Sequence, residues 1–390
     1  MVKLAFVIPG LTIGGAEKAV SLLSTELSKI HDIYVITLRK EVRLPHGGKM
    51  YVIGKNEKLV DKISSYVSFY KLIKLLKPDV VISLLTKAHT MNALTPAEAK
   101  RYIWVQNYPL HLHFRNKLIS IQDIFKWMTF YRQADKILVT SKLLAYRLTQ
   151  LYKLDSKKIY LLYNPINIEE INTVKNHELD HSEENFFGDP TYINVGRLTW
   201  QKGQWHLIRA FKEVLKELKD AKLIIVGAGG MKTFLHSLIK KLDLNDNVTL
   251  YGPTLNPYRL MARSDVFVFP SIKEGFGIAL VEALVCGLTV MSSDCPSGPR
   301  EILAPDKPYT QQPLKEPEFA QYGILMPVPD GVFRDHTQAI TKCEKIWAEW
   351  MTTVGLDKNI RRRYASIAPI RALDFDVKKI CKMLLDVISM

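Results

Sequence analysis

The sequence predicts an α/β protein built from two doubly wound domains. At 390 residues the chain is longer than one hydrophobic core usually supports, so two domains are expected. In both halves, short apolar runs end in glycine-containing turns and lead into helical patterns, which is typical of parallel sheets covered by helices. A polar, acidic stretch at 166–190 separates the halves. We therefore expect one domain over 1–170, a second over 171–370, and a terminal helical segment over 371–390.

The first half begins with one complete unit of strand, turn and helix. An apolar run at 4–9 is followed by a turn at 10–15 and by a helical pattern at 16–30. The turn lacks the GxGxxG spacing of dinucleotide-binding proteins, and no acidic residue ends the second strand, so a nicotinamide-dependent oxidoreductase is disfavoured. The further strands expected in this half are 33–38, 80–84, 102–105, 136–140 and 159–163, with a long helix at 118–134 and Ser141 as the cap of the next helix.

The second half repeats the alternation of strands and helices from residue 192. A proline-rich stretch at 305–329 is expected to be an irregular surface excursion, and the final pattern at 377–388 is an amphipathic helix. The strands expected here are 192–195, 222–226, 248–251, 266–269 and 288–291, and the helices are 206–218, 255–263 and 278–286.

One helical stretch in the first half, 62–77, has two interpretations. Its apolar residues fall on one helical face, and lysines flank that face. It is either a core helix with a solvated basic edge or a basic amphipathic helix that rests on a membrane interface. The apolar residues are Ile63, Tyr66, Val67, Tyr70 and Ile73, and the lysines are Lys71, Lys74 and Lys77.

The positive charge is concentrated in the first half. Residues 1–175 contain 27 Lys and Arg and 13 Asp and Glu, a net charge of +14, whereas the remainder contains 27 and 26, a net charge of +1. Such a half predicts attraction to an anionic partner: a nucleic acid, an acidic membrane surface or a phosphorylated lipid. The alternative is a soluble basic face without a partner. No recognised nucleic-acid-reading module is present, so nucleic acid is not expected.

Cysteine usage and apolar runs predict a cytoplasmic protein. Four widely separated cysteines without a CxxC pair argue against a zinc site and a disulfide framework, and they favour a reducing compartment. No apolar run is long enough to cross a bilayer. The opening residues MVKLAFVIPGL form too short a run for a signal peptide and are consistent with a first buried strand.

The strongest indication of chemistry is the stretch 266–303. A strand there ends before the loop 273–277, and a helix starts at Ile278. Glycines in such a turn let a ligand approach the backbone, and the N-terminus of the helix favours a phosphate. Glu274 stands at the mouth of this site and Glu282 about two helical turns later, which suits the hydroxyls of a sugar and of a ribose.

A second loop, 196–203, carries two cations between two glycines. Arg197 and Lys202 are five residues apart and can both reach one diphosphate, the arginine as a fork and the lysine as a point charge. The alternative is a pair of ordinary surface cations.

The Glu-x7-Glu pattern in EGFGIALVEAL, followed by GPREIL, resembles the retaining nucleotide-sugar glycosyltransferases of family 4. GRLTWQKG is similar to the G-R-x4-K-G loop of that family, and GGAE to its first-domain motif. The resemblance covers residues 190–303 strongly and the first domain mainly through GGAE and the order of elements. It implies the GT-B fold, in which two Rossmann-like domains face each other across a cleft and a C-terminal helix returns to the first domain.

The resemblance also implies roles for individual residues. Arg197 and Lys202 would hold the donor diphosphate and stabilise the leaving nucleoside diphosphate, so no metal and no cofactor are expected. Glu274 would bind the hydroxyls of the donor sugar, Glu282 would bind the ribose, and Arg197, Lys202 and Glu274 are the predicted catalytic residues. The predicted donor site comprises Gly14, Gly15, Gly196, Arg197, Lys202, Gly227, Gly252, Glu274, Gly275, Phe276, Gly277, Ile278 and Glu282.

The acceptor side departs from the family pattern. Many members have a histidine just after the strand expected at 102–105, where this chain has Gln106 or Asn107. The candidate acceptor-binding residues are Asn107, His111 and His113, and which of the two histidines replaces the family histidine stays open.

Together these expectations describe a transferase. The chain is expected to move a hexose or N-acetylhexosamine, with retention, from a nucleotide-diphosphate sugar to a glycan or lipid-linked glycan such as lipopolysaccharide. The family resemblance favours UDP as the nucleotide of the donor. The GPREIL form of the last motif is similar to that of bacterial surface-polysaccharide transferases. The basic first domain would place the enzyme peripherally on the inner face of the cytoplasmic membrane. The alternatives are a sugar-nucleotide epimerase with the same fold and a non-catalytic scaffold that binds a sugar nucleotide or a glycan.

Overall fold

The computed structural model describes residues 1–54, 59–93, 95–96, 98–106, 131–308 and 313–390. The chain divides into two compact units. The N-terminal domain comprises Met1–Ile166 and Phe375–Met390, and the C-terminal domain comprises Asn167–Asp374. The divisions fall at 166/167 and 374/375, beside the 170/171 and 370/371 expected from composition. The reason for the first shift is that the acidic stretch after residue 166 is not a linker alone: it forms α6 (Ile168–Val174) and a 3-10 turn (His181–Phe186) of the C-terminal domain.

The N-terminal domain is built on one parallel sheet. Its strand order is β3-β2-β1-β4-β5-β6-β7, and each neighbouring pair is parallel. The central strand β1 is buried from Leu4 onward, as a strand covered on both faces must be. The carboxyl ends of the strands therefore share one edge, where ligands bind in open α/β sheets. The strands are β1 (Lys3–Ile8), β2 (Asp32–Thr37), β3 (Lys49–Val52), β4 (Val80–Leu84), β5 (Lys100–Val105), β6 (Lys136–Val139) and β7 (Ile159–Leu161).

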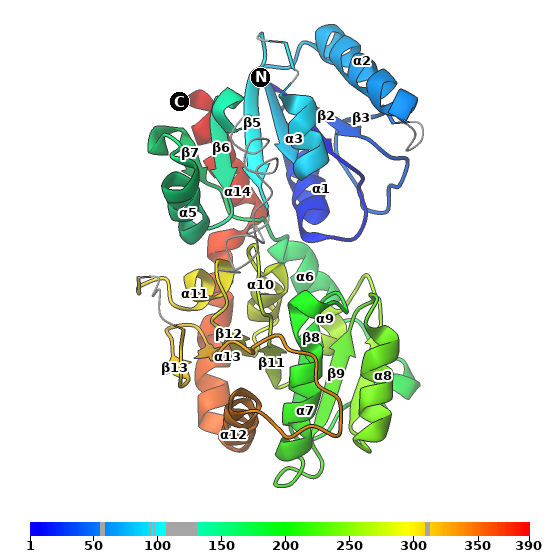
Figure 1. Ribbon diagram of the computed structural model, residues 1–390, viewed down its shortest axis with the longest axis vertical. Helices are drawn as coiled ribbons and strands as arrows, with labels where there is room; N and C mark the ends of the chain where they lie inside the picture. The colour runs from blue at the N-terminus through cyan, green and yellow to red at the C-terminus, as the bar shows by residue number, and fades with distance from the viewer. Residues whose placement is uncertain (55–58, 94, 97, 107–130, 309–312) are drawn as a thin grey trace. The chain divides into compact units, whose positions relative to one another are not determined.

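Helices connect and cover the strands of this sheet (Figure 1). Ser141 caps α5 as predicted, because its hydroxyl accepts a hydrogen bond from the N–H of Leu144 at 3.2 Å. The helix expected at 118–134 lies mostly outside the described residues. The helices are α1 (Gly15–Leu27), α2 (Leu59–Leu76), α3 (Thr86–Asn92), α5 (Lys142–Tyr152) and α14 (Val377–Ser389).

The C-terminal helix α14, red in Figure 1, returns to the N-terminal domain, as the resemblance implied. Ile380 and Leu384 are fully buried in the same hydrophobic cluster as Val20 and Leu23 of α1. The chain enters this helix through a parallel bridge at Ile166, whose N–H donates to the carbonyl of Phe375 at 2.8 Å. The amphipathic pattern of the helix is explained by this buried face.

The face that α2 buries differs from the predicted one. Phe69 and Ile73 are buried against the sheet, whereas Val67 and Tyr70 are 48% and 41% exposed. The helix carries apolar residues on both sides, with Leu75 also exposed, so periodicity alone does not say which side meets the sheet. For Val67 and Tyr70 the core-helix interpretation is therefore wrong, because they do not share the buried face of Phe69 and Ile73.

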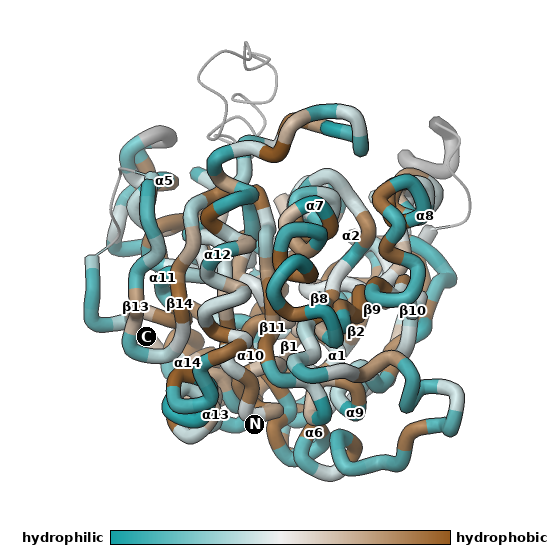
Figure 2. Tube along the Cα trace, turned by 90° about the horizontal axis from the view of Figure 1, so that it is seen from below, coloured by the Kyte–Doolittle hydropathy of each residue, from teal (hydrophilic) through white to brown (hydrophobic). Residues whose placement is uncertain are grey.

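The C-terminal domain has a second sheet, with strand order β10-β9-β8-β11-β12-β14-β13. Every neighbouring pair is parallel except β13 and β14, which are antiparallel. The strands are β8 (Thr191–Val195), β9 (Lys222–Val226), β10 (Val248–Gly252), β11 (Val266–Phe269), β12 (Thr289–Ser293), β13 (Glu318–Phe319) and β14 (Ile324–Met326). Figure 2 shows hydrophobic residues gathered along the strands and hydrophilic residues along the outer helices and loops.

Three predictions about this domain need correction. The stretch 305–329 is not only a surface excursion, because Ile324–Met326 is fully buried as β14 beside β12. So short a strand is not recognisable in a proline-rich sequence, and it is identified by its pairing with β12 in the sheet. The helix expected at 255–263 is only α9 (Tyr258–Met261). Besides α6, two more helices were not anticipated, α12 (Lys342–Leu356) and α13 (Lys358–Ala372). The other helices are α7 (Gln204–Val214), α8 (Lys232–Lys241), α10 (Ile278–Val285) and α11 (Gly298–Leu303).

Candidate active site

Four loops of the C-terminal domain meet at the carboxyl edge of its sheet, because each follows a parallel strand. Main-chain hydrogen bonds join neighbouring loops. The N–H of Leu198 donates to Ala228 O at 2.9 Å, and the N–H of Ile272 donates to Gln201 O at 2.9 Å. The loops are 196–203 after β8, 227–231 after β9, 270–277 after β11 and 294–297 after β12.

One glycine of the predicted site, Gly227, allows these loops to approach each other. A Cβ on Gly227 would lie 1.9 Å from the carbonyl oxygen of Gly196, far inside van der Waals contact. The N–H of Gly227 donates in turn to the carbonyl of Gly252 at 2.8 Å. The structure therefore places Gly196, Gly227 and Gly252 on three adjacent backbone segments at the edge.

Lys202 and Glu274 form an ion pair at this edge. The Nζ of Lys202 lies 2.6 Å from Oε1 of Glu274, and their side chains are only 14% and 8% exposed. The ammonium also lies 4.7 Å from the centroid of the Phe269 ring. The sequence assigned the lysine to a diphosphate and the glutamate to sugar hydroxyls, and it did not predict that the two side chains touch.

Arg197 is the exposed cation of the same loop. The amide of Gln204 donates to its carbonyl oxygen at 3.0 Å and holds its backbone, whereas within the described residues its guanidinium has neither an ion pair nor a hydrogen bond. A fixed backbone with an unengaged guanidinium leaves the five N–H donors available for an anion.

Glu282 lies on α10, one turn beyond the helix start. Its side chain is 6% exposed, and Oε1 accepts a hydrogen bond from the hydroxyl of Tyr258 at 3.1 Å. Gly277 precedes Ile278 as the N-cap residue, so the first N–H groups of α10 follow the Gly275-Phe276-Gly277 turn directly. A buried carboxylate oriented by a tyrosine suits recognition of a hydroxyl.

The GPREIL motif (298–303) and the serine before it, Ser297, pack against the Gly275–Gly277 turn. The hydroxyl of Ser297 donates to the carbonyl of Gly275 at 2.5 Å. Gly298 packs so closely that a Cβ there would lie 1.6 Å from the carbonyl oxygen of Phe276. Ser297 adopts a φ of 92°, which is rare for a residue with a side chain, and such strain is characteristic of functional turns. Sequence reasoning did not identify Ser297.

Arg300 of the same motif is a structural residue. Its guanidinium is buried and binds Asp294 at 2.7 Å and Glu318 at 2.9 Å, so it holds α11 against the strand β13. Burial raises the pKa of Asp294, and the Arg300 guanidinium opposes that rise. The closed network leaves this arginine without a role toward a ligand.

Lys273 is a cation that sequence reasoning missed. It is buried, and burial lowers its pKa, although the neighbouring Glu274 carboxylate acts in the opposite direction. Its position directly before Glu274 in the loop was the available signal.

Two residues of the predicted donor site, Gly14 and Gly15, lie at the start of α1 in the N-terminal domain. Gly14 is the N-cap residue of α1 and Gly15 its first residue, and a Cβ on Gly14 would meet the carboxylate of Glu17 at 2.4 Å. Gln106, at the carboxyl end of β5, is buried. The three candidate acceptor residues, Asn107, His111 and His113, lie outside the described residues.

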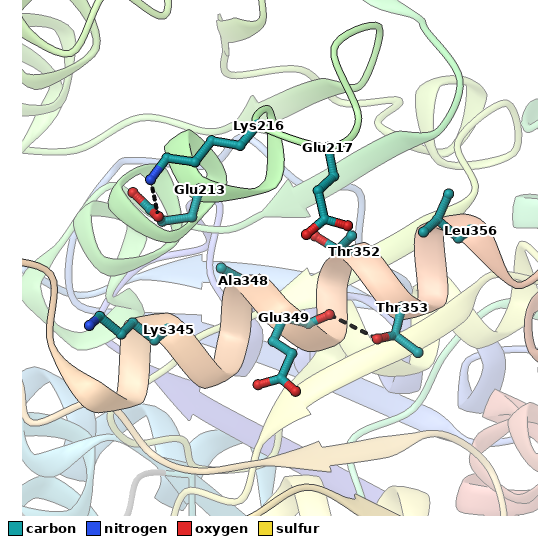
Figure 3. A pocket seen from close by; sticks show the side chains of 9 residues that line it. All are labelled: Glu213, Lys216, Glu217, Lys345, Ala348, Glu349, Thr352, Thr353 and Leu356. Carbon is teal, nitrogen blue, oxygen red and sulfur yellow. Dashed lines mark hydrogen bonds and ion pairs between the residues drawn. The ribbon is translucent and has the colours of Figure 1, made fainter.

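Two further features of the described chain bear on ligands. Among the described residues, no group of three or more His, Cys, Asp or Glu side chains is arranged to hold a metal ion. A hollow of about 350 Å³ lies between α7 and α12 (Figure 3). Its walls include Lys216 and Glu213, which pair with each other at 2.5 Å, and it shares no residue with the predicted site.

Fold and site together define a class: an α/β protein of two doubly wound domains, one of which presents cations, carboxylates and a helix N-terminus at its sheet edge. Comparison with known families is consistent with this class. Residues 176–318 match the family described as glycosyl transferases group 1, and residues 13–170 match glycosyltransferase family 4. The chain belongs to this family of glycosyltransferases.

Individual relatives span most of the chain. An uncharacterized glycosyltransferase of Methanocaldococcus jannaschii is 35% identical over 333 residues, which is 80% of each chain. A Campylobacter jejuni protein named N-acetylgalactosamine-N,N'-diacetylbacillosaminyl-diphospho-undecaprenol 4-alpha-N-acetylgalactosaminyltransferase is 27% identical over 394 residues, which is 98% of each chain.

Solved structures establish the GT-B fold. Anabaena HepE in complex with UDP-glucose superposes with a TM-score of 0.76 at 18% identity and covers 100% of both chains. WaaG, a glycosyltransferase involved in lipopolysaccharide biosynthesis, superposes with a TM-score of 0.72 at 16% identity and covers 99% of both. At these identities the comparison concerns the fold alone.

Proposed function

We propose that this glycosyltransferase transfers a hexose or N-acetylhexosamine, with retention, from a UDP-sugar to a lipid-linked or lipopolysaccharide-type glycan in bacterial surface glycan synthesis. The observation that carries the donor part is the sheet edge where the Lys202–Glu274 pair, the unengaged Arg197 and the start of α10 lie on neighbouring loops. The complex of HepE with UDP-glucose and the name of the C. jejuni relative support the carrier and the acceptor class.

The proposed reaction needs no protein nucleophile. The bond from the anomeric carbon to the diphosphate oxygen breaks, and an acceptor hydroxyl oxygen forms the new bond on the same face of the sugar. The departing phosphate oxygen takes the proton of that hydroxyl. Arg197 and Lys202 stabilise the charge that develops on the leaving diphosphate, so the reaction requires neither a metal nor a cofactor.

The ion pair gives Lys202 a defined starting position. In the structure Glu274 accepts from its ammonium, which has three donors, so a phosphate oxygen can be bound without breaking that contact. Glu274 then keeps its second oxygen for a hydroxyl of the donor sugar. Both side chains are oriented before the donor arrives, and preorganised charge is what makes such stabilisation effective.

Calorimetric titration with UDP, GDP, ADP and NAD, with and without EDTA, tests the donor site. We expect tight binding of one nucleoside diphosphate, unchanged by EDTA. Arg197→Ala or Lys202→Ala should remove about 2–4 kcal/mol of transition-state stabilisation, by analogy with loss of one oxyanion donor. Lys216→Ala, which removes an exposed cation from the turn after α7 in the same domain, is the matched control and should leave kcat/KM unchanged. Near-normal turnover of Arg197→Ala or Lys202→Ala would contradict the assigned roles.

Turnover of the UDP-sugar, measured with and without an acceptor, distinguishes the transferase from the two alternatives, an epimerase and a scaffold. An epimerase converts the donor sugar without any acceptor, whereas a transferase releases UDP in proportion to the acceptor glycosylated. A scaffold binds the nucleotide or glycan and releases no product. If the protein binds none of the four nucleotides, a non-catalytic scaffold becomes the favoured interpretation.

Membrane association is the second part of the proposal. The N-terminal domain contains 29 Lys and Arg and 13 Asp and Glu, a net charge of +16, and the C-terminal domain contains the other 25 and 26, a net charge of −1. No described helix is long and apolar enough to cross a membrane. On α2, Val67, Tyr70 and Leu75 are exposed together with Lys71 and Lys74, a combination that suits the surface of an anionic bilayer.

Sedimentation with anionic liposomes at low and moderate salt tests this part. We expect binding that weakens as salt rises. Lys71→Glu/Lys74→Glu should reduce it. Lys212→Glu/Lys216→Glu, at the end of α7 and in the turn after it in the C-terminal domain, should not. Absence of binding at low salt would remove the membrane proposal and leave the donor site untouched.

A further inference from the structure

A segment without regular structure, residues 327–335, lies against the loop that carries the two cations. We name it the strap segment. Indole N–H groups hold it at three carbonyls. Trp200, Trp205 and Trp347 donate to the carbonyls of Gly331, Val332 and Pro327 at 2.7, 3.0 and 2.9 Å. Arg209 of α7 donates to the carbonyl of Asp335 as well.

Buried charges fix the elements behind the strap segment. The carboxylate of Glu344 is almost fully buried and binds Nδ1 of His206 at 2.8 Å and Nε of Arg209 at 3.0 Å. Glu344 also closes a capping box with Thr341 at the start of α12. The segment therefore rests on a rigid junction of α7 and α12 and can serve as a fixed reference for the loop in front of it.

Of the three tryptophans, Trp200 has a special place. It opens the 3-10 turn Trp200–Lys202, and Lys202 closes that turn, with the N–H of Lys202 donating to Thr199 O at 3.0 Å. The same short turn therefore contains both Trp200, which donates to the strap segment, and Lys202, whose ammonium pairs with Glu274. Trp205 and Trp347 lie on helices outside this turn.

Gly331 is shaped to receive this indole. Its φ is +72°, and a Cβ there would lie 2.9 Å from Cζ2 of Trp200 and 3.2 Å from Cδ1 of Ile272. The ring therefore packs directly on the backbone of Gly331 while its N–H donates to the carbonyl of the same residue. A side chain at this position would displace the ring and the turn together.

We propose that Trp200 is a positioning residue of the donor site. By bonding the 3-10 turn to the strap segment, it holds the ammonium of Lys202 against Glu274 and toward the leaving diphosphate. This inference rests on the proposed role of Lys202 in binding that diphosphate. Lysine is a flexible point charge on a long stem, so the turn that carries it must be held from outside.

The experiment compares two variants that each remove one indole N–H from the strap segment, Trp200→Phe and Trp347→Phe. The probe is UDP in calorimetry, with turnover of the UDP-sugar measured in parallel. We expect Trp200→Phe to weaken UDP about tenfold and to lower kcat, whereas Trp347→Phe keeps the affinity within about twofold. Equal losses in both variants would show that the indoles are merely structural and would overturn the proposal.

A second comparison tests whether Trp200 acts through Lys202. If it does, adding Trp200→Phe to Lys202→Ala changes UDP affinity no further, and an additive loss contradicts the inference. Gly331→Ala provides an independent variant of the same contact, and we expect it to weaken UDP as Trp200→Phe does. If the wild type binds no nucleotide, the proposed function itself fails. If the wild type binds UDP and depends on Lys202 but tolerates Trp200→Phe and Gly331→Ala, only this inference fails.

Discussion

Replacing Gly298 with alanine adds one methyl group behind the candidate donor site. The new Cβ would lie 1.6 Å from the carbonyl oxygen of Phe276 and 2.6 Å from its Cα, so the contact is with backbone and cannot be relieved by rotating a side chain. Bringing the first distance to about 3.0 Å requires the Gly275–Gly277 turn and the start of α11 to separate by more than 1 Å.

The size of the effect follows from this displacement. Overpacking of this kind costs about 1–3 kcal/mol of folding free energy. The displaced turn leads into α10 and carries the backbone expected to meet the donor, and a misplacement of about 1 Å can lower turnover about 100-fold. We therefore expect a variant that still folds, with a large loss of kcat/KM for the UDP-sugar.

The matched control is Gly230→Ala in the loop after β9. A Cβ on Gly230 would meet nothing within 4 Å, and its φ lies outside the range that side chains avoid. Thermal unfolding and initial rates of UDP release would be measured for both variants. If Gly298→Ala keeps kcat/KM within a few-fold of Gly230→Ala, the packing of GPREIL behind the donor turn does not position the site, and the reasoning is refuted.

Three further predictions concern buried titratable groups. Lys202→Met should lower the free energy of unfolding by about 3 kcal/mol, because it leaves the buried Glu274 carboxylate unpaired, and adding Glu274→Gln should restore most of it. Burial alone would raise the pKa of Glu344, but hydrogen bonds from His206, the N–H of Thr341 and Arg209 lower that pKa overall. The Glu344 carboxylate therefore stabilises the fold above its ordinary pKa of 4.5. This stabilisation is lost as the pH falls through the lowered pKa. Burial lowers the pKa of His89 from 6.5 to about 3, so stability should fall by about 1.4 kcal/mol per pH unit below 6.5 as the unfolded chain takes up the proton that the folded chain refuses.

Separate measurements check each of the three. Urea unfolding of the single and double variants gives the coupling of Lys202 and Glu274, and a coupling below about 0.5 kcal/mol would show that the pair adds nothing. Glu344→Gln should flatten the loss of stability as the pH falls below 4.5, and an unchanged slope counts against the assignment. NMR titration should find the His89 ring neutral at pH 5, and protonation near pH 6.5 would refute its burial argument.

The sequence predicted most of the buried strands and the alternation of strands and helices, because buried parallel strands and glycine turns leave a local pattern, but β3, α3, α6, α12 and α13 were not predicted. Val80–Leu84 and Val266–Phe269 were predicted to the residue. Local pattern failed where it admitted two answers. Because α2 has apolar residues on both sides, its sequence does not show which face is buried. The strand β14 has only three residues and lies in a proline-rich stretch, so its sequence pattern does not identify it as a strand.

The chain by itself determined the chemistry of the candidate site: two cations in one glycine-bounded loop, and two carboxylates around the start of one helix. The tertiary structure decided which of these groups meet. Lys202 and Glu274 are 72 residues apart and lie 2.6 Å from each other because β8 and β11 are parallel neighbours, which brings the loops after them to one edge. The contact of Trp200 with Gly331 spans 131 residues and has no local signal at all. Side-chain types can be read along the chain, but their distances follow from strand pairing, which only the folded protein fixes.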